Sequence, residues 1–301
     1  MQWQYWDNPY GPADSLAWVE NGVVVCHCAS LPVPIRTKRH ARLGVISVDA
    51  ATAPTHRGRH LYQQLLEESV RAGRERELGI CLYFETIEGP AKLWDVAKVR
   101  LEPFILPLDL KWLAQRIRLP RHLSTALRVV VRTPPAGDAC EVADVPEGLD
   151  DLWSATHAAG EWTVVKDEAW WRWRFGAHPY GVYRFFELRD GDTLRGAAVT
   201  RPRQLGDRPV EYLVELLARD DAAARALVGL IGQSTPEAVA IVARATSASP
   251  LVRWIRTAGF RRVPDRFEPK HPWVTWWPAL VEFAASESIP WAITLGDSDS
   301  I

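Results

Sequence analysis

The feature that most constrains this chain is an internal repeat, in which one pattern of residues occurs twice, 170 positions apart. Residues 3–11, WQYWDNPYG, return as residues 173–181, WRFGAHPYG. The turn Asn21-Gly22 likewise returns as Asp190-Gly191, each time between two strand-like runs. Because turn chemistry and spacing repeat together, the sequence predicts two copies of one structural unit within 301 residues.

Hydrophobic periodicity and turn residues predict the same order of elements in both copies. In the first copy we expect a helix end at 3–7, a hairpin over 17–29, a strand over 43–49, a helix over 58–76, a strand over 80–85 and a short helix over 90–97. The matching ranges in the second copy are 168–175, 184–200, 210–217, 221–232, 238–243 and 250–258. Each copy therefore reads as an α/β unit.

One junction in the first copy has the properties of a phosphate-binding turn. Residues 45–66, VISVDAATAPTHRGRHLYQQLL, pass from an apolar run through a Pro- and Gly-containing turn into an amphipathic helical pattern. A helix that begins at such a turn exposes unpaired backbone N–H groups at the positive end of its dipole, and Arg57 and Arg59 add two cations. The alternative is an ordinary structural strand–turn–helix junction.

Residues 54–60, PTHRGRH, resemble the pyrophosphate turn of the GCN5-related N-acetyltransferase (GNAT) superfamily, whose pattern is Gln/Arg-x-x-Gly-x-Gly/Ala. Thr55 stands where the family has Gln or Arg, and His60 stands at the second Gly or Ala. The resemblance implies an acyl-CoA donor, with acetyl-CoA expected. It assigns the donor contacts to Ala50, Ala51, Thr52, Arg57, Gly58, Arg59, His60, Leu61 and Tyr62.

The order of elements resembles the central GNAT topology in both copies. This resemblance implies an α/β (α+β) fold of two tandem GNAT-like domains, each a mixed, mostly antiparallel sheet flanked by helices. We place an N-terminal domain at 1–118, a linker with a strand over 127–132 at 119–146, a C-terminal domain at 147–269 and a Trp- and Pro-rich tail at 270–301. The first domain has no counterpart of the family's first strand and helix, so the second domain or residues 104–131 would cover that face, unless the start is truncated.

The two copies differ at the turn. In the second copy the corresponding residues 217–222 read LARDDA, with no Gly and with carboxylates at Asp220 and Asp221. Two negative charges would repel a pyrophosphate group. We therefore expect the second copy to be degenerate for cofactor binding.

The resemblance also implies direct attack of an amine on the acyl thioester beside residues 49–52, with no covalent enzyme intermediate. A base for this reaction is expected at the carboxyl ends of neighbouring strands, because the ligand crevice of an α/β sheet opens there. Asp49 is the first candidate and Glu85 the second. The structural alternatives are a turn residue for Asp49 and an exposed strand-end carboxylate for Glu85.

The proton donor is left open by the sequence. Many GNAT enzymes carry a Tyr four residues before a Gly-Phe pair, but here Ile255 precedes Gly259-Phe260. Water, Tyr83 or another group would then protonate the leaving thiolate, or the acid is absent. Glu215, the second-copy counterpart of Asp49, and Trp94 are the expected substrate contacts.

Composition limits the partners of the chain. The formal net charge of −1 gives no cationic surplus for nucleic acid, and no apolar run is long enough to span a membrane. The first residues lack the basic and apolar segments of a signal peptide, so we expect a cytoplasmic protein. Four cysteines are too few and too scattered for a disulfide framework, and no further ligands complete a zinc site.

Together these observations predict an N-acetyltransferase that moves an acyl group from acyl-CoA to an amine in a ternary complex, acting as a monomer or homodimer. The ending WAITLGDSD looks like that of tandem GNAT-like proteins of bacterial polysaccharide biosynthesis, which suggests an amino sugar or polysaccharide precursor as acceptor. One alternative is a FemAB-like aminoacyl transferase, against which the near-neutral charge and the Arg-Gly turn weigh. The other is a non-catalytic acyl-CoA or metabolite-binding protein, which His60 and the missing Tyr favour.

Overall fold

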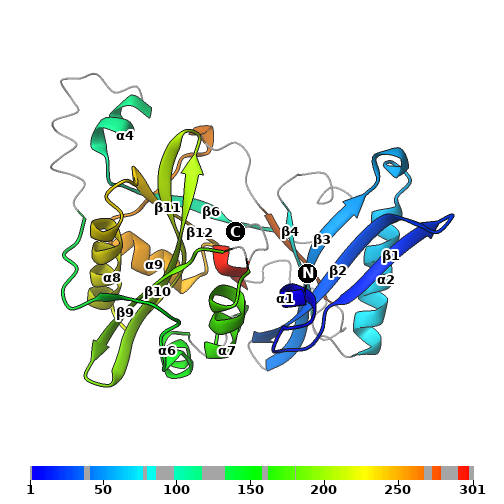
Figure 1. The fold of residues 1–301 in the computed structure, drawn as a ribbon, viewed down its shortest axis with the longest axis horizontal. Coiled ribbons are helices and arrows are strands. Elements are labelled where there is room, and N and C mark those ends of the chain that lie inside the picture. Colours follow the sequence, from blue (N-terminus) through cyan, green and yellow to red (C-terminus); the bar gives the residue numbers. More distant parts are fainter. Residues whose placement is uncertain are drawn as a thin grey trace.

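The structure is a computed structural model that describes residues 2–36, 41–76, 80–85, 98–116, 133–157, 162–179, 181–267, 273–278 and 291–297. The chain forms two β-sheets in separate lobes (Figure 1). Helices α1 (Gln2–Tyr5) and α7 (Glu168–Trp171) lie between the lobes, together with residues 291–297, which we call the C-terminal segment. The predicted strand at 127–132 and the predicted helix at 90–97 fall outside the described residues.

The first sheet has the strand order β15-β8-β2-β3-β4-β14-β5, and β1 also pairs with β2. Its strands are β1 (Asp14–Glu20), β2 (Val23–Arg36), β3 (Ala41–Thr52), β4 (Ile80–Glu85), β5 (Lys98–Arg100), β8 (Trp162–Val164), β14 (Trp273–Pro278) and β15 (Trp291–Ala292). The short helix η1 (Pro54–His56) leads into α2 (Leu61–Glu75), which covers the outer face of this sheet (Figure 1).

The second sheet has the strand order β13-β6-β12-β11-β10-β9-β7. Its strands are β6 (Glu102–Pro107), β7 (Cys140–Val142), β9 (Arg184–Asp190), β10 (Thr193–Leu205), β11 (Arg208–Ala218), β12 (Ala240–Ala245) and β13 (Arg261–Arg262). The helices of this part are α4 (Leu110–Arg116), α6 (Leu149–Thr156), α8 (Asp221–Ser234), α9 (Pro250–Thr257), the π-helix η3 (Arg172–Gly176) and the 3-10 helices η4 (Asp265–Phe267) and η6 (Leu295–Asp297).

Strand directions agree between the two sheets. In the first, β3 and β4 are parallel, whereas β1, β2 and β14 run antiparallel to their neighbours. In the second, β11 and β12 are parallel, whereas β9, β10 and β6 run antiparallel to their neighbours. The predicted fold class, mixed and mostly antiparallel sheets flanked by helices, is confirmed.

Each sheet takes a strand from the other part of the chain. Strand β6 follows β5 closely in sequence, yet it pairs with β12 and β13 of the second sheet. Strand β14 follows β13, yet it pairs with β4 and β5 of the first sheet. Residues 1–118 therefore hold most strands of the first sheet, which also takes β8, β14 and β15 from later in the chain, and residues 147–269 hold most strands of the second sheet, which takes β6 from the first segment.

Local sequence explains where the elements begin and end. Asn21 and Gly22 both have positive φ, 50° and 78°, as a tight two-residue hairpin turn requires. The side chains of Asp167, Asp220 and Ser249 accept backbone N–H groups at the starts of α7, α8 and α9. Helix α2 begins at Leu61 rather than at the predicted residue 58, because residues 57–60 form the turn.

The two copies of the repeat meet at equivalent residues. The rings of Trp3 and Trp173 stack with centroids 5.6 Å apart and an interplanar angle of 26°. Trp3 Nε1 donates to the carbonyl oxygen of Trp173 at 2.7 Å, and Trp173 Nε1 donates to the carbonyl oxygen of Trp3 at 3.1 Å. The contact is thus reciprocal, like a two-fold interface between subunits, but lies within one chain.

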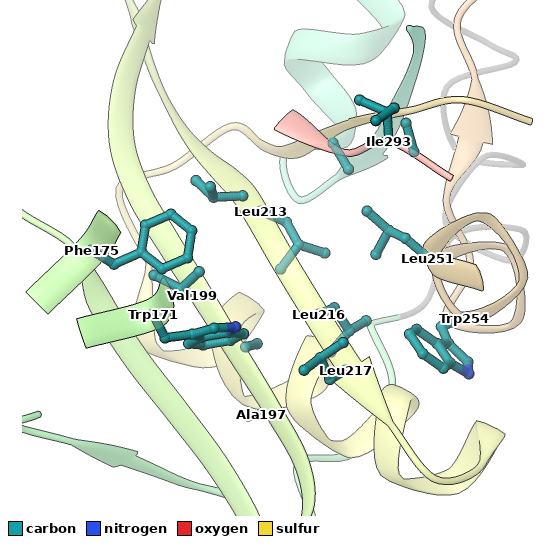
Figure 2. Close-up of a cluster of buried hydrophobic side chains, with 14 of the residues drawn as sticks. Trp171, Phe175, Ala197, Val199, Leu213, Leu216, Leu217, Leu251, Trp254 and Ile293 are labelled. Carbon is teal, nitrogen blue, oxygen red and sulfur yellow. The ribbon is translucent and has the colours of Figure 1, made fainter. Parts of the chain in front are cut away.

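The second lobe supplies much of the buried core. Trp171 and Phe175 lie next to β10, and Trp254 of α9 lies across β11 from them, with Leu216 between (Figure 2). Ile293 of the C-terminal segment belongs to the same cluster. The C-terminal segment is therefore built into the core of the second lobe.

The second lobe also covers the inner face of the first sheet. This is one of the two alternatives that the sequence offered for covering that face. Trp170 and Trp173 line a cavity of about 10 Å³ together with Leu31, Val33, Ile46, Val48, Arg174 and Asp297. A space of this size holds about one water molecule, so it has no room for an acceptor.

The strand exchange predicts that a first-segment residue stabilises the second sheet. Leu106 of β6 is 1% exposed and pairs with Ile241 of β12. We expect Leu106→Ala to lower the free energy of unfolding by about 3 kcal/mol through the cavity it leaves. Denaturant unfolding measures the loss, and hydrogen exchange should rise in β12 more than in β4. Faster exchange confined to β4 would contradict the exchange of strands.

Candidate functional site

The carboxyl ends of β3 and β4 separate from each other. The two strands pair only at Val45 with Cys81, Ile46 with Leu82 and Ser47 with Tyr83. Strand β3 continues to Thr52 and pairs there with β2 alone. The edge of residues 48–52 that faces away from β2 therefore has backbone groups with which an extended ligand could pair.

Asp49 lies at a β-bulge in this separated stretch. Ala51 pairs with His27 and Val48 pairs with Ala29, so β3 carries one residue more than β2 between these pairs. Asp49 has φ of 51°, a left-handed conformation that Asp adopts more readily than most residues, and it is exposed. A bulge re-aims side chains, and here it turns a carboxylate outwards at the end of the parallel pair.

Two side chains that the sequence did not single out lie against Asp49. Tyr5 of α1 donates its hydroxyl proton to Asp49 Oδ2 at 2.7 Å. His27 Nδ1 lies 3.1 Å from the Asp49 carbonyl oxygen, which can only accept, so Nδ1 carries the proton. A sequence signal for Tyr5 existed, because its counterpart in the repeat is Phe175, which lacks the hydroxyl.

The turn that follows β3 has the geometry of an anion site. Gly58 and His60 have positive φ, 79° and 58°, and a Cβ on Gly58 would meet nothing within 4 Å. Within the described part of the chain, the backbone N–H groups of Gly58, His60 and Leu61 have no hydrogen-bond acceptor. These donors sit at the start of α2, where the helix dipole favours an anion.

The carboxylate of Glu20 contacts two cationic or polar side chains at the turn. Glu20, at the end of β1, accepts from Arg59 at 2.5 Å and lies 3.2 Å from His56 Nε2. The Arg59 guanidinium lowers the pKa of Glu20 below its ordinary value. Arg57 lies apart from this group, with its Nε 3.4 Å from the carbonyl oxygen of Thr52.

The corresponding turn of the second sheet carries its own anion. Asp220 Oδ1 accepts from the backbone N–H of Ala223 at 2.8 Å, and Arg195 donates to the other carboxylate oxygen. The carboxylate thus fills the position at the start of α8 that a phosphate would take. This geometry agrees with the expected repulsion of a pyrophosphate.

The C-terminal segment fills the second gap between parallel strands. Strands β11 and β12 pair only as far as Leu213 with Ala243, and beyond this point the segment enters. Thr294 bridges to Ala245 of β12, and the backbone N–H of Thr246 donates to the Ile293 carbonyl oxygen at 2.9 Å. The second gap is therefore occupied by the chain itself.

Glu215 is buried in an ion-pair network beside this segment. Lys166 Nζ lies 2.5 Å from Glu215 Oε2 and 2.8 Å from Asp297 Oδ2, and all three side chains are at most 3% exposed. Burial raises the pKa of Glu215. Burial by itself lowers the pKa of Lys166, but the Asp297 and Glu215 charges outweigh it and raise that pKa. The network has one cation for two carboxylates, so it depends on Lys166.

The remaining predicted site residues are placed as follows. Ala50 and Ala51 are exposed, Thr52 and Tyr62 are half-buried, and Leu61 is buried under the turn. The backbone of Glu85 ends β4, opposite Trp273. Trp94 lies outside the described residues. Asp49 and the turn share one edge of the first sheet, whereas Glu215 belongs to the second sheet; its substrate role stays a prediction.

Two further observations concern ligands and membranes. Within the described ranges, no group of three His, Cys, Asp or Glu side chains is arranged to hold a metal ion. None of the described helices is long and apolar enough to cross a membrane.

Comparison with known sequences places this geometry in a family context. Residues 1–84 match the family model described as the acetyltransferase (GNAT) domain. These first residues are therefore similar to a GNAT acetyltransferase domain, and the match covers less than a third of the chain. The match includes β3, the turn and most of β4, so the turn described above lies within the matched residues. No curated protein matches the chain.

Solved structures share the fold well beyond residues 1–84. A GCN5-related N-acetyltransferase from Anabaena variabilis aligns with a TM-score of 0.63 and 10% identity, over 89% of this chain and 63% of that one. Saccharomyces cerevisiae N-myristoyltransferase with bound myristoyl-CoA aligns with a TM-score of 0.57 and 12% identity, over 85% of this chain and 67% of that one. Eis1 from Mycobacterium abscessus aligns with a TM-score of 0.54 and 16% identity, over 89% of this chain and 64% of that one. The chain spans about three fifths to two thirds of the length of these proteins, and the likeness shows that they share its fold.

The buried network predicts a large effect of removing its cation. Lys166→Met leaves Glu215 and Asp297 facing each other in the core, so we expect the free energy of unfolding at pH 7 to fall by about 3–5 kcal/mol. The deficit should shrink at pH 5, because protonation of a carboxylate relieves the repulsion. Urea unfolding at both pH values measures it, with the exposed Lys111→Met as control. An equal deficit at both pH values would contradict the account.

The contact of Glu20 with the turn predicts competition with anions. Glu20→Gln removes the carboxylate that holds Arg59, so we expect the affinity for inorganic pyrophosphate to rise by about two- to fivefold. Isothermal titration calorimetry measures the change. Glu75→Gln, at the far end of α2, is the matched control and should leave the affinity unchanged. A fall in affinity would show that Glu20 helps to build the site.

Proposed function

We propose that the protein is an acyl-CoA-dependent N-acyltransferase, with acetyl-CoA as donor and an amine as acceptor. The observation that carries this proposal is the combination of the separated strands β3 and β4 with the open turn at residues 57–61. One feature offers backbone pairing to an extended chain, and the other offers N–H donors and two arginines to a pyrophosphate. Coenzyme A consists of a pantetheine arm joined to a pyrophosphate, so one such molecule could use both features.

The residues of the turn and of the preceding strand are proposed to bind different parts of the donor. The N–H groups of Gly58, His60 and Leu61 would hold phosphate oxygens, with Arg57 and Arg59 as counter-charges. Ala50, Ala51 and Thr52 would pair with the pantetheine arm, because none of the described strands pairs with them on the side away from β2. Leu61 and Tyr62 begin α2 and support the turn from below.

Asp49 is the proposed base for the reaction. Its exposed carboxylate sits at the bulge directly before the donor-binding stretch, where it can accept a proton from the attacking amine. Glu85, which ends the neighbouring strand, is the second candidate, and Trp94 and Glu215 are proposed acceptor contacts. The proposed acceptor class is an amino sugar or polysaccharide precursor.

The second sheet is proposed to be a degenerate GNAT-like copy with a supporting role. Its turn holds Asp220 in place of phosphate, and the C-terminal segment fills its gap. A non-catalytic acyl-CoA-binding protein is the second candidate function. This non-catalytic alternative is favoured by His60, which has a left-handed backbone conformation at the position where the family has Gly or Ala.

Calorimetric titration with acetyl-CoA tests the donor assignment. We expect saturable binding by the wild type and loss of binding in Gly58→Glu, because a carboxylate in the turn repels the pyrophosphate. Gly206→Glu is the matched control: Gly206 also has positive φ, 67°, with open space around it, but lies in the hairpin between β10 and β11. Both variants therefore carry the same backbone strain and the same added charge.

Either of two results would contradict the donor assignment. Absence of binding at millimolar acetyl-CoA would remove it, and equal loss of binding in both glutamate variants would place the effect in stability rather than in the turn. Binding without acyl transfer to any amine would favour the non-catalytic alternative.

A further inference from the structure

The site contains a phenol whose contact the proposed function does not use. Tyr5 lies on α1, far from Asp49 in sequence, and its hydroxyl reaches Asp49 Oδ2 at 2.7 Å. The contact stands at the open ends of β3 and β4, next to residues 50–52. No tyrosine occupies position 255, from which the family's proton donor would come.

We propose that Tyr5 and Asp49 form a proton relay in which Tyr5 protonates the leaving sulfur of the donor and Asp49 returns the proton to Tyr5. The inference rests on the proposed function, because it assigns both groups to the transfer of an acyl group from a thioester. It adds a catalytic residue that neither the turn motif nor the strand ends indicated.

The protonation states of the pair suit this exchange. Burial raises the pKa of Tyr5, and the hydrogen bond and charge of Asp49 raise it further, with a smaller contribution from Cys28. The phenol therefore holds its proton at neutral pH, as a proton donor must. Once Asp49 accepts a proton, its negative charge disappears, so the phenol becomes more acidic at the moment when it is needed.

The relay balances in protons and electrons. The amine nitrogen forms a bond to the acyl carbon, the carbon–sulfur bond breaks, and its electron pair stays on sulfur. Asp49 Oδ2 takes the proton released by the nitrogen, and Tyr5 Oη gives its proton to the sulfur. The proton on Asp49 then passes across the 2.7 Å hydrogen bond to the Tyr5 oxygen. The products are an amide and a thiol, and both side chains return to their starting states.

The second lobe holds Tyr5 in place. Helix α1 is fixed by the reciprocal hydrogen bonds between Trp3 and Trp173. On its other side the Tyr5 carbonyl oxygen accepts from the backbone N–H of Ala13 at 2.7 Å. A proton donor must keep its distance to the reacting atom, and these contacts supply that rigidity.

Steady-state kinetics of acetyl-CoA with a panel of small primary amines tests the relay. We expect Tyr5→Phe to lower kcat by about a hundredfold, the size of one acid–base contribution, while the Kd for acetyl-CoA changes little. Asp49→Asn should lower kcat at least as much, and the double variant should be no worse than the worse single variant, because the two groups act as one unit. Tyr10→Phe is the matched control: Tyr10 bonds Asp167 instead, and kcat should be unchanged.

A titration of the ligand-free protein gives an independent readout. Ultraviolet difference spectra between the wild type and Tyr5→Phe report ionisation of Tyr5, which we expect above the ordinary phenol pKa of about 10. In an Asp49→Asn background the Tyr5 pKa should move back down. A phenol that titrates identically in both backgrounds, or a Tyr5→Phe variant with wild-type kcat, would overturn the relay.

The two proposals can fail separately. Absence of acetyl-CoA binding by the wild type would remove the donor assignment, whatever the titration shows. Binding with normal turnover in Tyr5→Phe would keep the acyltransferase and remove the relay.

Discussion

The exchange of strands between the two sheets is the constraint on which the rest of the structure depends. β6 and β14 each lie beside the strand that forms the parallel pair, β12 in one sheet and β4 in the other. The backbone groups of β4 and β12 on that side are satisfied only by a strand from the other part of the chain. Neither sheet is complete without the other half, so the lobes are tied together by ladder hydrogen bonds as well as by side-chain packing. The reciprocal contact of Trp3 and Trp173 closes the same arrangement at α1.

The turns before α2 and α8 differ in whether a carboxylate of the protein accepts their backbone N–H groups. The turn before α2 leaves backbone donors without an acceptor, and Glu20 engages its Arg59 from the side. The turn before α8 carries its own carboxylate, Asp220. The gaps between the parallel strands differ likewise: among the described strands, only β2 pairs with residues 48–52 of β3, whereas the C-terminal segment fills the space between β11 and β12. The proposed ligand site therefore lies in the first sheet, and the corresponding space in the second sheet is occupied by the protein itself.

The sequence predicted most of the fold because its signals were local. Strand β4 has the predicted bounds, and α8 and β11 lie within two residues of theirs, because periodicity and turn residues act over short distances, whereas β2 and β10 run seven and five residues past the predicted hairpin ends. Helix α2 began later than predicted, since the Gly58 and His60 conformations extend the turn. Of the candidate site, Asp49 and the turn residues lie along one edge of the first sheet, as a strand followed by its own turn must. Tyr5 was missed because it reaches Asp49 only through tertiary contact.

The sequence by itself determined the mixed α/β class of the fold, and it predicted two related units and one turn that favours an anion, because these inferences follow from residue types at fixed spacing. Tertiary structure decided which strands pair, and it alone brought Tyr5 to Asp49 and Lys166 between Glu215 and Asp297. These contacts join segments distant in sequence, and nothing in the local pattern of either segment specifies its partner. The repeated residues account for the reciprocal contact of Trp3 and Trp173, whereas tertiary packing places the C-terminal segment between β11 and β12.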